Sequence, residues 1–292
     1  MATPDLRPRR SVLYMPAANE RALEKAKDIA ADALIFDLED AVAPDAKDEA
    51  RERACAMFAA GGYGSREIAI RANGIGTPWH DDDLAAIAAV GPDAVLVPKV
   101  NSAAEVYDLE AALERFGAPD RTKLWAMLET PVAMLHAEEI CGASERLTVL
   151  VMGTNDLAKE LHSQRVATRA PLLGGLHLSL LAARATDKVI IDGVYNDIKN
   201  DDGFLAECQQ GRQMGFDGKT LIHPSQVAPC NDAFSPEAAE VELAGRIIAA
   251  FDEAMREGRG VVTVDGRMIE NLHVDEARRV LAIQAAILKS EV

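Results

Sequence analysis

Aromatic side chains and positive charges are both scarce in this sequence. Phe, Trp and Tyr make up 4% of the 292 residues, which disfavours a surface that stacks on bases or sugar rings. Lys and Arg number 31 against 47 Asp and Glu, and the resulting formal net charge of −16 disfavours a general binder of the phosphate backbone. We therefore expect no nucleic-acid partner.

Paired cysteines and long apolar runs are lacking as well. Cys55, Cys141, Cys208 and Cys230 show no CxxC spacing, which is typical of free thiols in a reducing compartment. No apolar stretch approaches the roughly 20 residues of a membrane-spanning helix, and the basic start "MATPDLRPRR" has no apolar signal-peptide core after it. We expect a cytoplasmic protein with no membrane partner.

Eight apolar runs recur along the chain, with helix-like stretches between them. Most are apolar at successive positions, as expected for parallel strands that are covered on both faces. Eight strand–helix units predict an α/β fold of the (β/α)8 TIM barrel type, with a doubly wound open sheet as the alternative. The open sheet loses support because the sequence lacks GxGxxG after the first run and GxxxxGK(S/T) anywhere. The runs are "SVLYMP" (11–16), "ALIFDLED" (33–40), "EIAIRANG" (67–74), "AVLVPKV" (94–100), "LWAMLET" (124–130), "TVLVMGTND" (148–156), "KVIIDGVYND" (188–197) and "KTLIHP" (219–224).

The chain continues beyond the last of these runs. We predict a catalytic barrel of residues 1–230 and an extension of residues 231–292 that docks on its own barrel or on a neighbouring subunit. The segment from Ser235 on predicts a long amphipathic helix, with Ser235 as N-cap and Pro236 at the first position. Two short strands about a turn at Asp265-Gly266 and a final helix complete the extension.

Charged and polar side chains stand where the apolar runs end. In a (β/α)8 barrel the carboxyl ends of the strands surround the active-site mouth, so these positions are the candidates for chemistry. They are Asp37, Glu39, Asp40, Arg71, Asn73, Lys99, Glu129, Asn155, Asp156, Asp192, Asp197 and His223.

Glu129 and Asp156 follow the fifth and sixth runs, and two such carboxylates suffice for Mg²⁺, which keeps several waters as ligands. The alternative is that each acid caps the helix that follows it, since "TP" after Glu129 and "NDLAKE" around Asp156 are typical of helix starts. Arg71 is a candidate for holding a substrate carboxylate through two parallel hydrogen bonds. Its alternative role is an ion pair with Glu39 or Asp37 on the neighbouring strand.

Seven segments, taken in order, resemble a known family. The resemblance is to the CitE-like branch of the HpcH/HpaI aldolase and citrate lyase β-subunit superfamily, and it runs from residue 10 to residue 289. It implies a Mg²⁺-dependent (β/α)8 barrel, with Mn²⁺ as an alternative ion, that forms homotrimers or homohexamers and acts on short hydroxyacyl-CoA esters. The segments are "RSVLYMPAANERALEKA", "LIFDLEDAVAPDAKDEAR", "IRANGIGTPW", "LVPKV", "MLETP", "VMGTNDL" and "GFDGKTLIHPSQV".

The resemblance also assigns roles to individual residues. Glu129 and Asp156 match the metal ligands, and Arg71 matches the residue that holds the substrate carboxylate. Glu39 and Asp40, in "DLED", match acids near the waters around the metal. The positions that match the substrate and CoA path are Tyr14, Lys25, Asn155, Asp156, Ile222 and His223.

The C-terminal extension separates two activities within this superfamily. "VDGRMIENLH", together with "VMGTNDLAKEL", "IDGVYND" and "GFDGKTLIHP", looks most like the thioesterases that hydrolyse (3S)-malyl-CoA to (S)-malate and CoA. The lyases carry an Asp in a "MID" context, supplied by a neighbouring subunit, where this sequence has Glu270. Because the extra methylene moves the carboxylate by roughly an ångström, we hypothesise that Glu270 acts as a base on water.

Other outcomes stay open on the sequence alone. One is carbon–carbon cleavage of malyl-CoA, β-methylmalyl-CoA or citramalyl-CoA, which yields glyoxylate or pyruvate and an acyl-CoA. Another is citryl cleavage on an acyl-carrier protein within a complex, as the citrate lyase β-subunit performs it. A third is acyl-CoA binding without catalysis, and Glu270 itself has the alternative of a solvated surface position ahead of the last helix.

Overall fold

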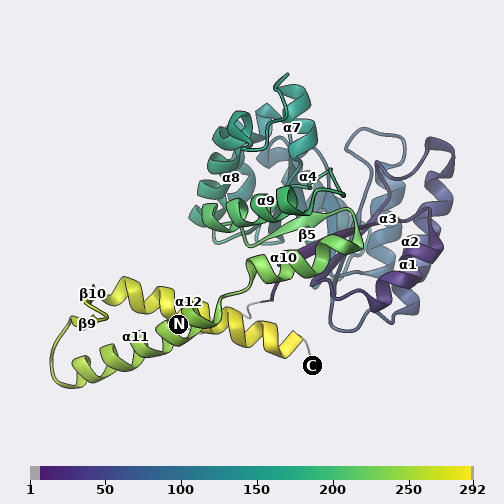
Figure 1. Cartoon of the computed structure of the whole chain (residues 1–292). Helices are drawn as coiled ribbons and strands as arrows, with labels where there is room; N and C mark the ends of the chain where they lie inside the picture. The colour runs from purple at the N-terminus through teal and green to yellow at the C-terminus, as the bar shows by residue number, and fades with distance from the viewer. Residues whose placement is uncertain (1–6, 291–292) are drawn as a thin grey trace. The chain divides into compact units, whose positions relative to one another are not determined.

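The eight apolar runs form a closed parallel barrel (Figure 1). The computed structural model describes residues 7–290, in which each barrel strand pairs with the next along the chain and β8 pairs with β1. The predicted (β/α)8 TIM barrel is therefore confirmed, and the open-sheet alternative is wrong. The strands are β1 (Ser11–Pro16), β2 (Ala33–Asp37), β3 (Glu67–Arg71), β4 (Ala94–Val97), β5 (Lys123–Leu128), β6 (Leu147–Met152), β7 (Val189–Asp192) and β8 (Gly218–Leu221).

Two apolar layers explain why the strands are apolar at successive positions. Val12 and Ile35 belong to the cluster that fills the barrel, whereas Leu13 and Phe36 belong to the larger cluster between strands and helices. Successive side chains of a strand point to opposite faces, so a strand covered on both faces needs apolar residues at both. All five residues of β2 are buried for this reason.

Helices surround the barrel (Figure 1), and four of the ten α-helices of this unit begin at a side-chain cap that the sequence carries. Ser102 and Thr130 are N-caps whose hydroxyls accept from backbone N–H groups, and Pro131 is the first residue of its helix. None of the helices within residues 7–290 is long and apolar enough to cross a membrane. The helices of this unit are α1 (Glu20–Lys25), α2 (Lys47–Ala60), α3 (His80–Val90), α4 (Ala103–Arg115), α5 (Pro131–Leu135), α6 (Ala137–Gly142), α7 (Thr154–Glu160), α8 (Leu173–Ala185), α9 (Asp201–Met214) and α10 (Val227–Phe234), with short 3₁₀ turns η1 (Ala26–Asp28), η2 (Pro44–Ala46), η3 (Ala170–Leu172) and η4 (Pro224–Gln226).

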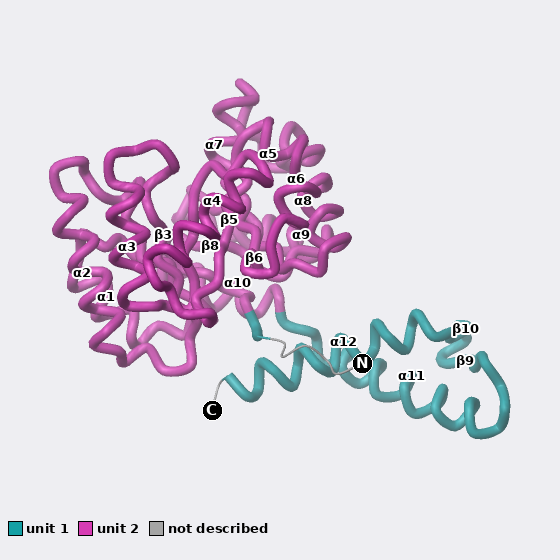
Figure 2. The backbone as a smooth tube through the Cα atoms, turned by 180° about the vertical axis from the view of Figure 1, so that it is seen from behind, with its two compact units in different colours: residues 1–8, 235–292 teal, residues 9–234 magenta. Residues whose placement is uncertain are grey.

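The barrel unit spans Arg9–Phe234, and the chain from Ser235 on belongs to a second unit, drawn in teal in Figure 2. Two long helices pack against each other in this second unit, and a two-stranded hairpin connects them. Its elements are α11 (Ala238–Arg256), β9 (Val262–Val264), β10 (Arg267–Ile269) and α12 (Asn271–Ser290).

The hairpin turn lies where the sequence predicts it, but the start of α11 does not. Asp265 and Gly266 have φ values of 49° and 76°, as a tight hairpin turn with two left-handed residues requires. The prediction of Ser235 as N-cap is wrong, because Glu237 takes that position. Glu237 and Glu240 form a reciprocal capping box, and this pair fixes the helix start beyond the proline.

Candidate active site

A cavity of about 390 Å³ opens at the carboxyl ends of the barrel strands. Asp37 ends β2, Arg71 ends β3, Glu129 follows β5, and Asp156 follows β6 in the first turn of α7. Asp40, in the loop after β2, completes the charged lining. The barrel thus brings together side chains that lie far apart in the sequence, because parallel strands present their carboxyl ends at one rim.

Glu129 is almost fully buried, with 3% of its surface exposed. Its Oε1 accepts a hydrogen bond of 2.9 Å from the backbone N–H of Lys99. Burial, with the nearby charges of Asp156 and Glu39, raises its pKa from 4.5 to about 8, although the Lys99 ammonium opposes this shift. Gly153 lies directly against it, and a Cβ at that position would overlap the carboxylate, so only glycine fits there. A divalent cation bound beside Glu129 would therefore favour the charged form of this carboxyl.

Neither Glu129 nor Asp156 caps a helix, so the capping alternative is wrong for both. Thr130 caps α5 with its hydroxyl, which accepts from the N–H of Ala133 at 3.0 Å. Gly153 occupies the N-cap of α7, and Asp156 stands two residues inside the helix start. Its carboxylate lies near the Lys99 ammonium instead, at 3.7 Å.

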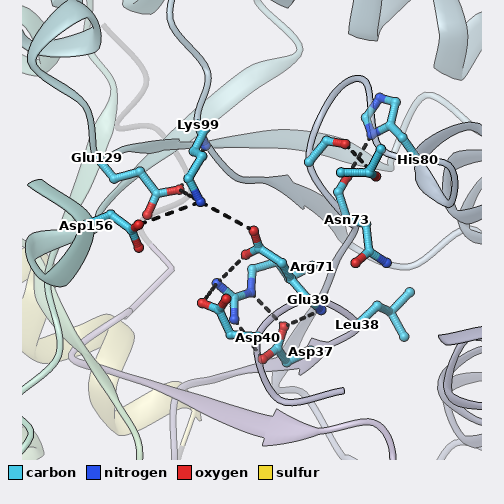
Figure 3. A network of polar contacts seen from close by, with 12 residues as sticks. Asp37, Leu38, Glu39, Asp40, Arg71, Asn73, His80, Lys99, Glu129 and Asp156 are labelled. Atoms are coloured by element: carbon cyan, nitrogen blue, oxygen red, sulfur yellow. Dashed lines mark hydrogen bonds and ion pairs between the residues drawn. The ribbon is translucent and has the colours of Figure 1, made fainter. Parts of the chain in front are cut away.

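Lys99 follows β4 with a left-handed backbone, φ 53°, which is uncommon for a residue with a side chain. Its Nζ lies 3.7 Å from Glu39 Oε1, 4.0 Å from Glu129 Oε1 and 3.7 Å from Asp156 Oδ1 (Figure 3). Burial opposes the ammonium charge, but the three carboxylates together raise the Lys99 pKa above its ordinary value. One lysine is thus the shared cation of three acids.

Arg71 realises the ion-pair alternative in full. Its Nε and Nη2 each donate to Asp37 at 2.7 Å in a two-bond fork, and its Nη1 lies 2.8 Å from Glu39 Oε2 (Figure 3). Asp40 is a more distant partner of Nη1 at 3.4 Å, and the guanidinium carbon lies 4.9 Å from the centre of the Tyr14 ring. Burial opposes its charge, yet Asp37 and Glu39 hold the Arg71 pKa well above its usual value. Asp37 and Asp40, the partners of all three guanidinium nitrogens between them, both line the cavity.

The mouth carries more acids than cations. Lys47, buried beside the cavity, donates to the carbonyl oxygens of Leu38 and Glu39 at 2.7 Å and 2.6 Å rather than to a carboxylate. Even with Lys47 counted, negative charges outnumber positive ones, and this excess fits a bound divalent cation. Within residues 7–290, no three His, Cys, Asp or Glu side chains are arranged as a complete metal cage. Arg71 and Lys99 are the ion-pair partners of five acids: Asp37, Glu39, Asp40, Glu129 and Asp156.

The other residues that the family resemblance singled out are distributed around this centre. Tyr14, Asn155 and Ile222 line the cavity. His223 is exposed and caps η4, where its side chain accepts from the N–H of Ser225. Lys25 ends α1 on the exposed surface and does not line the cavity.

Glu270 lies in the second unit, exposed, in the segment between β10 and α12. Its backbone N–H donates to the Nδ1 atom of His273 at 3.0 Å. Its proposed role as a base therefore concerns a different unit from the one that carries the cavity.

Two features of the site were not predicted. Asn196 lines the cavity and donates to Asn155 Oδ1 at 2.7 Å, so the loop after β7 is joined to the start of α7. The convergence of Lys99 on three acids was also missed. Its place after a strand put it at the mouth, but nothing in the sequence indicates the left-handed backbone that aims it.

Asp192 corrects the expectation that every strand-end acid faces the mouth. It is fully buried, accepts from Arg169 at 2.7 Å and from Lys219 at 2.9 Å, and does not line the cavity. Because Ile191 points into the barrel, the next residue points outward toward α9, whose Glu207 also accepts from Lys219 at 2.7 Å. Burial opposes the charge of Asp192, but Lys219 and Arg169 lower its pKa.

The closed barrel and its acid-rich mouth define the class of protein: a (β/α)8 barrel whose site suits a divalent cation and an anionic ligand. Residues 10–224 match the HpcH/HpaI aldolase/citrate lyase family, and the chain belongs to that family. It is 54% identical over 280 residues to (3S)-malyl-CoA thioesterase from Cereibacter sphaeroides, which covers 96% of this chain and 96% of that protein.

Two further relatives have other names. The citrate lyase subunit beta of Escherichia coli is 37% identical over 281 residues, 94% of this chain and 93% of that protein. The structure of CitE from Mycobacterium tuberculosis in complex with magnesium, acetoacetate and coenzyme A superposes with a TM-score of 0.79 at 28% identity. That match covers 96% of this chain and 99% of the CitE chain.

Proposed function

We propose that this protein hydrolyses (3S)-malyl-CoA to (S)-malate and CoA, with Mg²⁺ bound at the barrel mouth. The observation that carries the proposal is the 54% identity to a (3S)-malyl-CoA thioesterase over 96% of both chains. The excess of carboxylates at the mouth supports the metal, and the CitE relative is a complex with magnesium and coenzyme A.

Glu129 and Asp156 are the proposed metal ligands. The fit rests on the donor set, because Glu129 and Asp156 both line the cavity, and the raised pKa of Glu129, about 8, means that a bound cation would favour its charged form. Two carboxylates leave the remaining positions to waters and substrate oxygens, as Mg²⁺ usually requires. When bound, Mg²⁺ supplies a template and a Lewis acid that stabilises negative charge on a substrate oxygen.

Arg71 is the proposed anchor of the malyl carboxylate. Its Nε and Nη2 are committed to Asp37, which fixes the plane of the guanidinium. Its Nη1 is therefore the atom that donates to the ligand, in place of its weaker 3.4 Å contact with Asp40. Glu39 and Asp40 flank that nitrogen. They are proposed to accept hydrogen bonds from the waters around the metal.

The acyl-CoA path is proposed to run along the rim. Tyr14, Asn155 and Ile222 line the cavity and would contact the acyl part, and Ile222 offers an apolar surface that is 41% exposed. Lys25 and His223 are exposed side chains suited to the polar parts of CoA.

Glu270 is proposed as the general base that takes a proton from the attacking water, supplied by this chain or by a neighbouring copy. A carboxylate in that role transfers a proton without forming a covalent intermediate. The test is Glu270→Asp, which shortens the side chain by one methylene. We expect a several-fold fall in thiol release and a rise in glyoxylate formation, because base geometry is sensitive on the scale of about 1 Å. An unchanged ratio of products would remove Glu270 from the mechanism.

The second candidate is carbon–carbon cleavage, which the 37% identity to citrate lyase subunit beta favours. This candidate covers malyl-CoA, β-methylmalyl-CoA and citramalyl-CoA lyases, and cleavage of citryl groups on an acyl-carrier protein. In all of them a base removes the proton of the substrate hydroxyl rather than a proton of water.

A product assay with purified protein, (3S)-malyl-CoA and Mg²⁺ separates these functions. We expect release of thiol and (S)-malate without glyoxylate, and no release after chelation of the metal. Equal amounts of glyoxylate and acetyl-CoA would identify a lyase and contradict the thioesterase proposal. The absence of turnover with any hydroxyacyl-CoA ester would point to a carrier-bound substrate or to binding alone.

We also propose a cytoplasmic homotrimer or homohexamer, in which residues 231–292 dock on their own or a neighbouring barrel. All four cysteines are free, which supports a reducing compartment. Light scattering on the purified chain would test the assembly, and we expect a mass of three or six times 31.3 kDa. A monomer would contradict this part of the proposal.

A further inference from the structure

Lys99 holds an unusual position among the buried and half-buried lysines of the barrel. Its Nζ lies between 3.7 Å and 4.0 Å from carboxylate oxygens of Glu39, Glu129 and Asp156 (Figure 3). Charge-assisted hydrogen bonds between ammonium and carboxylate are about 2.7–2.9 Å long. The ammonium is therefore attracted by three acids and tightly hydrogen-bonded to none of them.

Two other lysines of the same unit show what a fixed ammonium looks like. Lys219 donates to Asp192 at 2.9 Å and to Glu207 at 2.7 Å, and its side chain has no exposed surface. Lys47 donates to two backbone carbonyls at 2.7 Å and 2.6 Å. Lys99 differs in both respects, because its contacts are long and 42% of its side chain is exposed.

The backbone of Lys99 is fixed although its ammonium is not. Its φ of 53° lies in the left-handed region, and its N–H donates to Glu129 Oε1 at 2.9 Å. The side chain thus leaves from a defined point beside the proposed metal ligand and can reach either the acids or the solvent.

We propose that the Lys99 ammonium is a displaceable counter-ion, which offsets the negative charge of Glu39 and Asp156 beside Glu129 in the metal-free protein and leaves this place when a divalent cation binds. The proposal rests on the assignment of Glu129 and Asp156 as metal ligands in the proposed function. A cation held by these acids and the Lys99 ammonium repel each other across a few ångströms, so both cannot keep the same place. Lys99 thereby weakens metal binding and keeps the acids together without it.

Metal affinity provides the first test, with Mn²⁺ titrated into the whole protein and the free ion measured by electron paramagnetic resonance. Lys99→Met keeps the unbranched stem and removes the charge, and we expect Mn²⁺ to bind about tenfold more tightly. Lys99→Arg keeps the charge and should bind no more tightly than the unmodified chain. Lys159→Met is the matched control, because Lys159 is an exposed lysine of the same α7 helix as Asp156 and, unlike Lys99, forms none of the ion pairs of the acids at the mouth.

The unmodified protein provides the second test, which does not depend on the folding of a variant. Lysines are methylated briefly with formaldehyde and a borohydride, and each modified lysine is quantified by peptide mass spectrometry. We expect saturating Mg²⁺ to raise the labelling of Lys99 severalfold and to leave Lys159 unchanged. Lower or equal labelling of Lys99 with Mg²⁺ would overturn the displacement.

The two proposals fail in different ways. If Lys99→Met binds Mn²⁺ as weakly as the unmodified chain or more weakly, the counter-ion role is wrong while the metal site stands. If the unmodified chain and Glu129→Gln bind Mn²⁺ equally, the metal assignment is wrong, and the proposal for Lys99 is overturned with it.

Discussion

Two clusters of acids and cations lie on the same barrel, and they differ in balance, contact length and exposure. The cluster around Asp192 has two acids and two cations, with hydrogen bonds of 2.7–2.9 Å, and its side chains are buried except for the partly exposed Glu207. The cluster at the mouth has five acids served by Arg71 and Lys99, and the Lys99 contacts extend to 4.0 Å. The first cluster has equal numbers of acids and cations, and the second does not.

The comparison separates structural charge from functional charge. A buried pair with all partners present fixes packing, and its loss leaves an uncompensated charge in a low-dielectric interior. An excess of carboxylates in a cavity instead favours a cationic ligand. Without that ligand, the carboxylates repel one another and their pKa values are raised. Raised pKa values at Glu129 and Glu39, against a lowered one at Asp192, show this difference directly.

The largest effect is expected from a substitution in the cluster around Asp192, which we call the closed cluster; the cluster at the mouth is the open cluster. Lys219→Met leaves Asp192 and Glu207 without their shared cation, and we expect the free energy of unfolding to fall by about 3–5 kcal/mol, measured by urea denaturation. Mg²⁺ affinity of the folded fraction should stay within about twofold of the unmodified chain, since Lys219 does not line the cavity. A loss below about 1 kcal/mol would mean that this cluster is not a structural element.

Removing one acid from the open cluster should have the opposite effect: activity should fall and stability should not. We expect Glu129→Gln to lower Mg²⁺-dependent turnover by at least about a hundredfold, because one of the two proposed metal ligands is lost. Stability without metal should not fall, since the carboxyl that Gln replaces is costly to charge where it is buried. Kinetics and urea denaturation of the same preparation check both parts. Activity within tenfold of the unmodified chain would contradict the assignment.

The open cluster should also show a pH-dependent affinity for Mg²⁺. The raised pKa of Glu129, about 8, means that its contribution to metal-free stability is present below about pH 4.5 and is lost as pH rises through about 8. Mg²⁺ must displace this proton, so we expect affinity to increase about tenfold per pH unit between pH 6.5 and 7.5 and to level off above pH 8. Calorimetric titration at several pH values measures the slope. A flat profile would show that Glu129 is already charged.

The fold was predictable because its signals are local and repeated. Each strand is a short apolar run, and their number and spacing leave few architectures. The placement of Glu129 and Asp156 at one cavity followed from the same logic, since neighbouring parallel strands end at one rim. The hairpin turn was likewise predictable from Asp265 and Gly266, two residue types that tolerate a left-handed backbone.

The side-chain directions were not predictable. Asp192 and Asp37 both end strands, but Asp192 faces α9 while Asp37 binds Arg71 at the mouth. Which face the last residue takes depends on where each strand stops, and sequence patterns locate such ends only within a few residues. Competing caps are decided by geometry of the same fine scale, which is why Glu237 rather than Ser235 starts α11.

The smallest effect is expected from one peripheral glutamate of each cluster. Glu39 at the mouth contacts Arg71 and Lys99, and Glu207 in the closed cluster contacts Lys219. Glu39→Gln keeps an oxygen that can accept from Arg71 and removes a charge adjacent to the metal ligands. We expect Mg²⁺ affinity to fall about fivefold with little change in stability, since the lost attraction is partly screened by solvent. Glu207→Gln is the matched change, and it should lower the free energy of unfolding by about 1–3 kcal/mol and leave Mg²⁺ affinity alone. If the two variants changed Mg²⁺ affinity and stability equally, the charge balance of a cluster would not distinguish a functional cluster from a structural one.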